Sequence, residues 1–380
     1  MKDIFKIVLF PVVLVIGLNS CKTKNEANTN AIDENKVSLK SAYTNDFLIG
    51  AAINDNHINL TDTISTKLIE KEFNTITPEN TMKWMFIHPE KNSYNFKAAD
   101  KYVALGERNE MHIVGHTLVW HSQLPKWVNT IKDSSEMAQT LKKHIDTLVG
   151  RYKGKIHTWD VVNEALNEDG TLRTSIFLQT MGEGYLELAF KQAAKADPAA
   201  QLVYNDYNLW KPEKRAGVVR LVKKLQANGA KIDGVGMQGH WSLLGPSIED
   251  IENSILAYSA LGVKVMFTEL DVTALPNPWD LDGAAVNENY DEFEGDPKMN
   301  PYPNGLPESI KVKLAKRYED IFNLFLKHQD KIDRVTFWGV GDGQSWLNNW
   351  PINGRTNYPL LFDRAYEPKD AYHSVMDLKK

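Results

Sequence analysis

Short apolar, β-branched segments recur along the chain from about Val37 and alternate with longer segments of helical periodicity. Continuous apolar segments of this length are typical of parallel strands that are buried on both faces. We predict eight such strands, at residues 47–53, 73–77, 111–118, 156–162, 201–206, 234–240, 264–270 and 335–340. The pattern therefore favours a parallel sheet covered by helices.

The segments between the strands carry the start and stop signals of helices. Pro212 suits a first helical turn, and Gly150 and Gly229 lie where helices are expected to end. The predicted helices cover 61–70, 98–109, 134–150, 182–196, 212–228, 247–261, 308–329 and 369–378. Eight strand–helix units predict an α/β fold, a single (β/α)₈ TIM barrel, whose active site lies at the carboxyl ends of the strands. No glycine-rich phosphate loop follows the first strand, which disfavours a dinucleotide-binding fold.

The first 36 residues differ in character from the rest of the chain. A short basic start precedes an apolar stretch at residues 7–18, which is too short to span a bilayer and is typical of a secretory signal segment. Residues 22–36 contain almost no apolar side chain and predict a flexible polar tether. The expected organisation is thus a signal segment at 1–21, a tether at 22–36 and one barrel domain at 37–380.

Cys21 is the only cysteine of the chain and follows the apolar stretch. The sequence Leu-Asn-Ser-Cys at residues 18–21 resembles a bacterial lipobox, in which the cysteine is diacylated and becomes the mature N-terminus. The resemblance implies a lipid anchor in the bacterial cell envelope. We expect the outer membrane, with the folded domain facing the periplasm or the cell surface. Cleavage of a plain signal segment beside an incidental cysteine is the alternative.

Composition narrows the choice of ligand. The chain of 380 residues has a net charge of −5 and no basic cluster, which disfavours nucleic acid or an anionic membrane surface as a partner. Ten Trp and fourteen Tyr exceed what packing alone usually requires. Aromatic faces in clefts commonly stack on flat ligands such as bases or sugar rings.

Polar side chains gather where the predicted strands end. The segments that follow strands two to eight are TPENTMKW, GHTLVWH, VVNEAL, YNDYN, MQGHW, TELD and FWGVGDGQSW. The opposite ends of these strands carry nothing comparable. Because buried polar groups are unfavourable without partners, we expect these side chains on the barrel rim, facing a ligand.

Two glutamates end strands on opposite sides of the predicted barrel mouth, Glu164 after the fourth strand and Glu269 after the seventh. Hydrolysis of a glycosidic bond needs a proton donor for the leaving oxygen and a second carboxylate on the other face of the sugar. If the second carboxylate attacks directly, the two lie roughly 5–5.5 Å apart and the anomeric configuration is retained. Each charge raises the pKa of the other glutamate, so one stays protonated near neutral pH. Strand-end glutamates are common in barrels, so the pair alone does not decide the function.

The motifs around the two glutamates indicate the function. TPENTMKW, GHTLVWHSQLP, WDVVNE, YNDYN, GVGMQGHW, FTELDV and FWGVGDGQSW, in this order and spacing, closely resemble those of glycoside hydrolase family 10, the endo-β-1,4-xylanases. The likeness runs from about residue 38 to the C-terminus. It implies a retaining endo-β-1,4-xylanase that cleaves internal bonds of xylan through a covalent glycosyl-enzyme. Xylan and xylo-oligosaccharides are then the partners, with no cofactor, and we expect a monomer.

The resemblance also implies residue roles. Glu164 is the expected acid/base and Glu269 the nucleophile; His240 orients Glu269, with Asp271 behind it. Asn163 is expected to bond the 2-hydroxyl of the cleaved sugar. The other implied substrate contacts are the glycone-side group Glu79, Asn80 and Lys83, the enclosing residues His116, Trp120 and Gln238, the aromatic walls Trp338 and Trp346, and the aglycone platform Tyr207.

Plainer interpretations stay open for several of these residues. Glu79 and Lys83 could form an ordinary i,i+4 ion pair on a helix. His240 could be a hydrogen-bonded core histidine, and Trp338 and Trp346 could be core residues.

A metal site is disfavoured by the sequence. His116 and His121 lie five residues apart across a strand end and would point apart. No cysteine or acidic residue stands at ligand spacing from them, so we expect no metal.

The main departure from the family is a long segment at about 272–307, rich in Pro, Asn and acidic residues. It far exceeds an ordinary strand-to-helix loop and leaves the seventh strand beside Glu269, so we expect it over the cleft. Trp279, Tyr290 or Tyr302 could add a sugar platform there, or the segment could be a rigid surface excursion.

Two other functions remain as alternatives. A related barrel hydrolase could act on β-1,4-glucan or a mixed-linkage substrate. A lipid-anchored glycan-binding protein that has lost catalysis is more remote, because such a protein should lack one of the two glutamates.

Overall fold

The computed structural model describes residues 37–278, 281, 286 and 288–380. Contacts divide the chain into units at residues 1–33 and 34–380, and the described residues all belong to the second. The predicted signal segment, Cys21 and the tether lie outside the described residues. Within the described part of the chain, no helix is both long enough and apolar enough to cross a bilayer.

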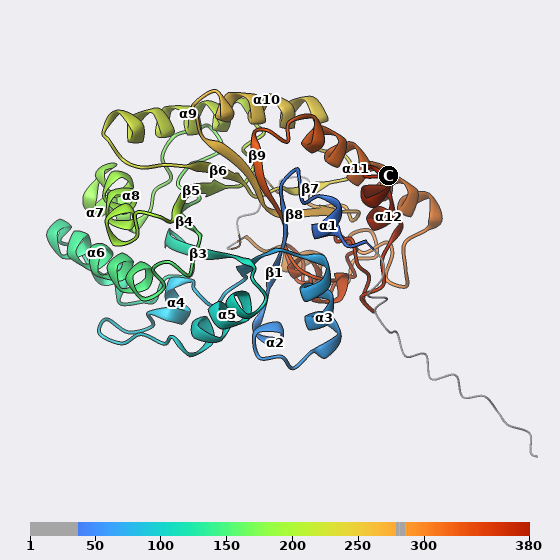
Figure 1. Cartoon of the computed structure of the whole chain (residues 1–380), viewed down its shortest axis with the longest axis horizontal. Helices are drawn as coiled ribbons and strands as arrows, with labels where there is room; N and C mark the ends of the chain where they lie inside the picture. The colour runs from blue at the N-terminus through green and yellow to red at the C-terminus, as the bar shows by residue number, and fades with distance from the viewer. Residues whose placement is uncertain (1–36, 279–280, 282–285, 287) are drawn as a thin grey trace, which may run out of the picture. The chain divides into compact units, whose positions relative to one another are not determined.

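Eight parallel strands close into a barrel with the helices around it, which confirms the predicted fold (Figure 1). The ring runs in chain order from β1 to β6, then through β8 and β9 back to β1, and the short β7 pairs with β8. The strands are β1 Leu48–Ile53, β2 Thr75–Pro78, β3 His112–Trp120, β4 Thr158–Asn163, β5 Gln201–Asp206, β6 Gly234–Met237, β7 His240–Ser242, β8 Lys264–Thr273 and β9 Ile332–Phe337.

All eight predicted helices are present, and the described residues form four shorter α-helices as well. The predicted set is α3 Thr63–Glu72, α5 Lys97–Arg108, α6 Ser134–Arg151, α8 Gly184–Ala196, α9 Pro212–Ala227, α10 Ile248–Ser259, α11 Glu308–Lys327 and α12 Asp370–Asp377. The additional helices are α1 Leu39–Ala42, α2 Asp55–Ile58, α4 Trp84–Ile87 and α7 Ile176–Met181. A helix of one or two turns has too few residues to show an apolar period, so sequence reasoning missed them.

The sixth predicted strand, at 234–240, is divided in the structure. Gly239 has a φ of 85°, outside the extended region, so β6 ends at Met237 and β7 begins at His240. The eighth strand also ends earlier than expected, at Phe337, which leaves Trp338 on the loop beyond it. Both breaks occur at the barrel rim and turn side chains toward the mouth.

The layer between the strands and the surrounding helices is closely packed. Trp159 on β4 is fully buried, and a Cβ at Gly115 on β3 would lie 2.2 Å from its ring. Outside the barrel, Phe325 of α11 stacks on Phe267 of β8 with ring centroids 3.9 Å apart. This apolar packing against the helices gives the strand ends a rigid base.

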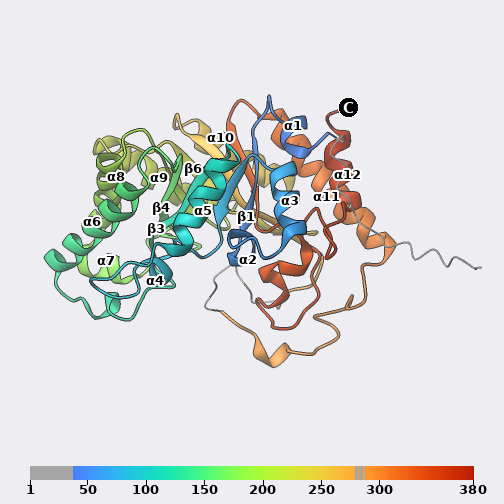
Figure 2. The same cartoon turned by 60° about the horizontal axis from the view of Figure 1, so that its bottom comes forward.

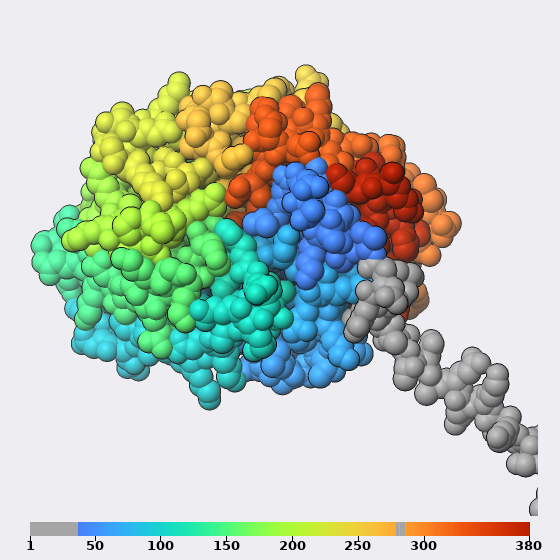
Figure 3. Space-filling model, in the orientation of Figure 1, coloured from blue at the N-terminus to red at the C-terminus, as the bar shows by residue number. Residues whose placement is uncertain are grey.

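The two ends of the described chain meet and close the ring of helices. The hydroxyl of Tyr43, just after α1, donates to the carbonyl oxygen of Val375 in α12 at 2.7 Å. Figure 3 shows the blue N-terminal residues packed against the dark red C-terminal ones.

The long segment after β8 is fastened to the loop that follows β9. The Trp350 indole donates to the carbonyl of Glu288 at 3.0 Å, and the amide of Tyr290 donates to the carbonyl of Pro351 at 3.0 Å. The hydroxyl of Tyr358 donates to the carbonyl of Tyr302 at 2.7 Å. Figure 2 shows the described part of this segment as an orange excursion at the bottom of the view.

Candidate active site

A cavity of about 130 Å³ opens at the carboxyl ends of the barrel strands. Twelve of the fourteen residues expected in the site line it, and only Asp271 and Tyr207 do not. The cavity is lined by Glu79, Asn80, Lys83, His116, Trp120, Gln123, Asn163, Glu164, Gln238, His240, Glu269, Val286, Trp338 and Trp346. Residues far apart in sequence therefore meet because the strand ends share one rim.

The loop after β2 shows that Glu79 and Lys83 are not a helical ion pair. The helix α4 begins only at Trp84, so this plainer interpretation is wrong. Lys83 donates instead to the side-chain oxygen of Asn80 at 3.0 Å, and its ammonium lies 5.1 Å from the centroid of the Trp120 ring. Burial lowers the pKa of Lys83, although the carboxylates of Glu269, Glu79 and Glu164 oppose that shift.

Glu269 is held by donors on both carboxylate oxygens. His240 Nε2 lies 3.2 Å from Oε2, and the side-chain amide of Asn205 donates to Oε1 at 2.8 Å. Burial alone would raise the pKa of Glu269, but the hydrogen bond from His240 and the nearby charge of His116 bring it below its usual value. The environment therefore favours an ionised carboxylate at this position.

His240 links Glu269 to a second carboxylate. Its Nδ1 lies 3.0 Å from Oδ2 of Asp271, which also accepts from the indole of Trp346 at 2.9 Å. Burial disfavours a charged ring, but Asp271 and Glu269 outweigh it and raise the pKa of His240 to about 10. A protonated ring donates from both nitrogens, so His240 and Asp271 together aim Glu269.

Glu164 has neutral donors in place of a cation. The indole of Trp120 donates to Oε2 at 2.8 Å, and the side-chain amides of Gln238 and Asn163 donate to Oε1 at 3.0 and 3.2 Å. Burial and the charge of Glu269 raise the pKa of Glu164, against the effect of these hydrogen bonds. The protonated form is therefore favoured more at Glu164 than at Glu269.

Asn205 on β5 joins the two glutamates and was not assigned from the sequence. Its amide nitrogen donates to Glu269 and, at 2.9 Å, to the side-chain oxygen of Asn163. The side-chain nitrogen of Asn163 in turn donates to Glu164. A Cβ at Gly236 on the neighbouring strand would lie 2.5 Å from the Asn205 side-chain oxygen. An amide within the buried strand QLVYND was the available signal.

The backbone of Glu164 is in the left-handed region, with a φ of 56°. For a residue with a side chain this conformation costs roughly 1–2 kcal/mol. Its amide donates to the carbonyl of Asn205 at 2.8 Å, which fixes the chain just after β4 ends at Asn163. The strand thus stops where the side chain of Glu164 has to turn into the cavity.

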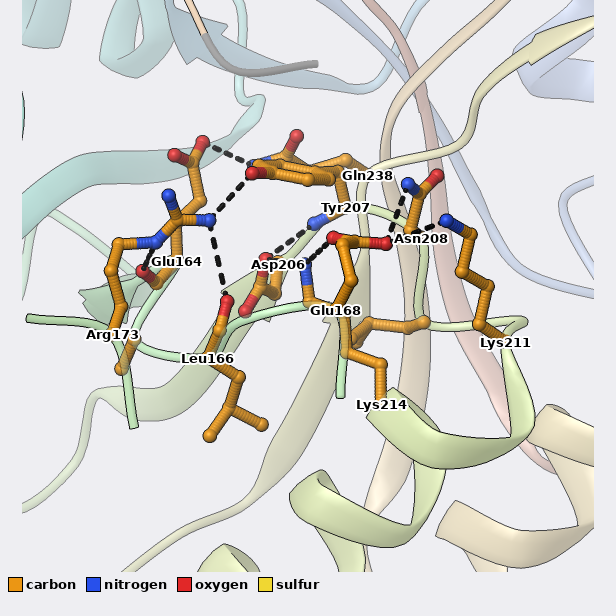
Figure 4. A network of polar contacts seen from close by, with 12 residues as sticks. Glu164, Leu166, Glu168, Arg173, Asp206, Tyr207, Asn208, Lys211, Lys214 and Gln238 are labelled. Carbon is orange, nitrogen blue, oxygen red and sulfur yellow. Dashed lines mark hydrogen bonds and ion pairs between the residues drawn. The ribbon is translucent and has the colours of Figure 1, made fainter. Parts of the chain in front are cut away.

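The structure does not present Tyr207 as an exposed ring, although the family resemblance implied that it is the sugar platform on the aglycone side. Tyr207 is only 3% exposed, and its hydroxyl accepts from Arg173 at 2.5 Å (Figure 4). The ammonium of Lys214 lies 3.7 Å from the centroid of its ring. Lys214 is itself fully buried, so its ammonium covers one face of the Tyr207 ring.

The aromatic residues of the long segment have different positions. Val286 is the described residue of this segment that lines the cavity, so the segment does reach the cleft. Tyr302 instead lines a separate groove that contains Ser242 and Leu275. Tyr290 does not line the cavity, and its ring stacks on Phe293. Trp279 lies outside the described residues.

Trp338 and Trp346 both line the cavity. Trp338 is buried and meets the ring of His116 edge-on at 5.5 Å, and Trp346 stacks on Trp350 at 4.5 Å. His116 itself bonds Oδ2 of Asp160 at 2.9 Å. Among the described residues, no group of three or more His, Cys, Asp or Glu side chains is arranged to hold a metal ion.

The raised pKa of His240 predicts a pH-dependent contribution to stability. A group whose folded pKa lies above its unfolded value of 6.5 stabilises fully below pH 6.5, and this stabilisation is lost as the pH rises toward 10. The free energy of unfolding of the wild type and of His240→Gln should therefore converge between pH 6.5 and 10. Urea titrations at several pH values measure this, and a difference that stays constant would contradict it.

Comparisons with known proteins show the family of this chain. The model of glycosyl hydrolase family 10 matches residues 38–378. Endo-1,4-beta-xylanase A of Xylanibacter ruminicola is 44% identical over 92% of this chain and 95% of its own length. The beta-1,4-xylanase of Dictyoglomus thermophilum is 42% identical over 89% and 90%. A GH10 endoxylanase structure from a sugarcane soil metagenome has a TM-score of 0.85 and 45% identity, and covers 91% of this chain and 100% of its own. The chain belongs to glycosyl hydrolase family 10.

Proposed function

We infer that this protein is a retaining endo-β-1,4-xylanase, which hydrolyses internal β-1,4 bonds of xylan by double displacement. The observation that carries this inference is a pair of buried glutamates in one cavity, with the pKa of Glu164 raised and that of Glu269 lowered. A protonated acid beside an ionised nucleophile is what the first step of a retaining mechanism needs. Membership of the family and the xylanases among its relatives support the same activity.

In the first step we propose that Glu269 attacks the anomeric carbon while Glu164 gives its proton to the leaving oxygen. The carbon–oxygen bond to the leaving sugar breaks as an ester to Glu269 forms. His240 and Asn205 keep the attacking carboxylate ionised and aimed. The amide of Asn163 bonds Glu164 directly and is linked to Glu269 through Asn205, so it is suited to bond the 2-hydroxyl of the sugar, a contact that strengthens in the transition state.

In the second step Glu164 acts as a base. Ester formation removes the negative charge of Glu269, which was raising the pKa of Glu164. The carboxylate of Glu164 is then stabilised by the donors Trp120 and Gln238 and takes a proton from water. The water oxygen attacks the anomeric carbon, the ester breaks, and Glu269 leaves as a carboxylate.

The small cavity supports a xylose unit as the sugar that is cleaved. Lys83 and Trp338 are buried in its wall, and a glucose unit would add a hydroxymethyl group in the same space. The glucan alternative is therefore less favoured than xylan. A glycan-binding protein without catalysis is disfavoured because both glutamates keep their hydrogen-bond partners.

Substrate choice and stereochemistry provide the direct test of this function. Activity on xylan should greatly exceed activity on carboxymethylcellulose at matched concentration. Proton NMR of the earliest product should show the β-anomer, because two displacements restore the configuration. An α-anomer as first product, or a preference for the glucan, would overturn the proposal.

Substitution of the two glutamates should have different effects on activity. Glu269→Ala should abolish turnover of every substrate and leave xylan binding intact. Glu164→Ala should lose ~10²–10⁴-fold on xylan and much less on aryl xylobiosides with an acidic phenol, since these need little protonation. Steady-state kinetics on both substrates and binding isotherms measure these effects. Wild-type turnover in Glu269→Ala is the result that contradicts the assignment.

We further propose that the mature protein is a monomer, lipid-anchored at Cys21 to the bacterial cell envelope with residues 22–36 as its tether. The lipobox-like sequence at residues 18–21 and the position of the sole cysteine support this. The outer membrane is the proposed location, with the barrel facing the periplasm or the cell surface.

Cys21→Ser should move the protein from the membrane fraction to the soluble fraction. The thioether bond to the lipid requires the thiol, so the serine variant cannot be anchored. Cell fractionation with xylanase activity as the readout measures the change. A wild-type N-terminus without a lipid adduct in the mass spectrum would contradict the proposal.

A further inference from the structure

Arg173 reaches back to the backbone of Glu164 from the far end of a short loop. This loop leaves β4 and returns through a bridge between Leu166 and Leu172. The Nε of Arg173 donates to the carbonyl oxygen of Glu164 at 3.1 Å, and its Nη2 donates to that of Leu166 at 3.3 Å (Figure 4). The amide of Arg173 also donates to the carbonyl of Ala165 at 2.8 Å.

These bonds act on a strained residue. Glu164 has a φ of 56°, and a change in this angle would swing its side chain relative to the sugar. The peptide on its N-terminal side is held by the Asn205 carbonyl, and the hydroxyl of Tyr204 accepts from the amide of Ala165 at 3.2 Å. Arg173 binds the carbonyl between these two anchors, so it completes the restraint of the backbone at Glu164.

The guanidinium of Arg173 is itself anchored through Tyr207. Its Nη2 donates to the Tyr207 hydroxyl at 2.5 Å, and the ring of Tyr207 lies against the ammonium of Lys214. Lys214 pairs with Asp206 at 3.0 Å, and both side chains are fully buried. Lys214 also pairs with Glu168 at 2.8 Å. The guanidinium is therefore fixed to the end of β5 and to the fully buried Lys214 of α9.

We propose that Arg173 is a positioning residue for the reaction: its planar guanidinium fixes the backbone of Glu164 and thereby aims the carboxyl group that protonates the leaving oxygen. This inference rests on the proposed role of Glu164 as acid/base. The fork of donors matters as well as the charge, because three acceptors in different directions are bound at once.

The test compares two substrates that differ in their need for a proton donor. Arg173→Lys and Arg173→Met are assayed on xylan and on a dinitrophenyl β-xylobioside. We expect kcat/KM on xylan to fall roughly 10- to 100-fold in both variants, because a misaimed acid transfers its proton poorly. Activity on the dinitrophenyl substrate should fall less than about threefold, since its leaving group needs little protonation.

Arg220→Met is the matched control. Arg220 on α9 donates to the carbonyl of Gly170 at 3.0 Å, so it holds the same loop without touching Glu164. We expect wild-type rates on both substrates for this variant. A loss on xylan alone in Arg220→Met would mean that any loosening of the loop is enough, and it would overturn a specific role for Arg173.

Glu164→Ala on the same two substrates separates the inference from the proposed function. If Glu164→Ala shows no selective loss on xylan, the proposed function fails. If it does, but the Arg173 variants lose the same factor on both substrates or keep wild-type rates, only the role of Arg173 is overturned. Thermal unfolding checks folding, and if Arg173→Met does not fold, the result for Arg173→Lys decides.

Discussion

The chemistry of this molecule depends on two buried carboxyl groups that have different hydrogen-bond environments. Glu269 accepts a hydrogen bond from His240, which Asp271 keeps charged, whereas Glu164 accepts from an indole and two side-chain amides. In a buried site, a hydrogen bond from a charged histidine to one of two carboxyl groups separates their pKa values. The same carboxylates at the surface would titrate almost alike. Burial, and hence the barrel, is therefore a condition of the chemistry.

The barrel meets this condition because its strands end on a common rim. The glutamates lie on β4 and β8, and the amide that joins them lies on β5. Close packing of these strands against the helices leaves little room for movement, so the partners of each hydrogen bond stay in place. The polar network stabilises the fold only while every member keeps its partner. Asn205 shows this dependence, since it bonds one glutamate directly and the other through Asn163.

The loops beyond the strands complete the wall of the cavity and hold the backbone of Glu164. Trp346 closes the cavity from the loop after β9, and that loop in turn holds the long segment after β8 through Trp350 and Pro351. One wall of the cavity thus depends on a segment whose described residues beyond Thr273 lie outside the sheet. On the other side, Arg173 braces the turn at Glu164 from within a short loop. Specificity and acid catalysis are linked in this way to irregular but well-bonded parts of the chain.

The sequence by itself determined the barrel, the eight strands and the two glutamates. The apolar period shows which strands are buried, and the polar residues that follow them mark the rim. The resemblance to family 10 implied that Lys83, His240 and the aromatic walls line the site, and the structure places them at the cavity. Its expectations for Cys21 and residues 1–36 concern a part of the chain that the structure does not describe.

Tertiary structure alone decided which buried polar atoms face one another. The covering of Tyr207 by Lys214, the bridging role of Asn205 and the contact of Arg173 with Glu164 follow from how neighbouring strands and loops are placed in space. The apolar period in the sequence indicates that a side chain points inward. It does not indicate which atom of the neighbouring strand that side chain contacts. Strand register, the break at Gly239 and the left-handed turn at Glu164 set those distances, and each depends on closure of the whole barrel.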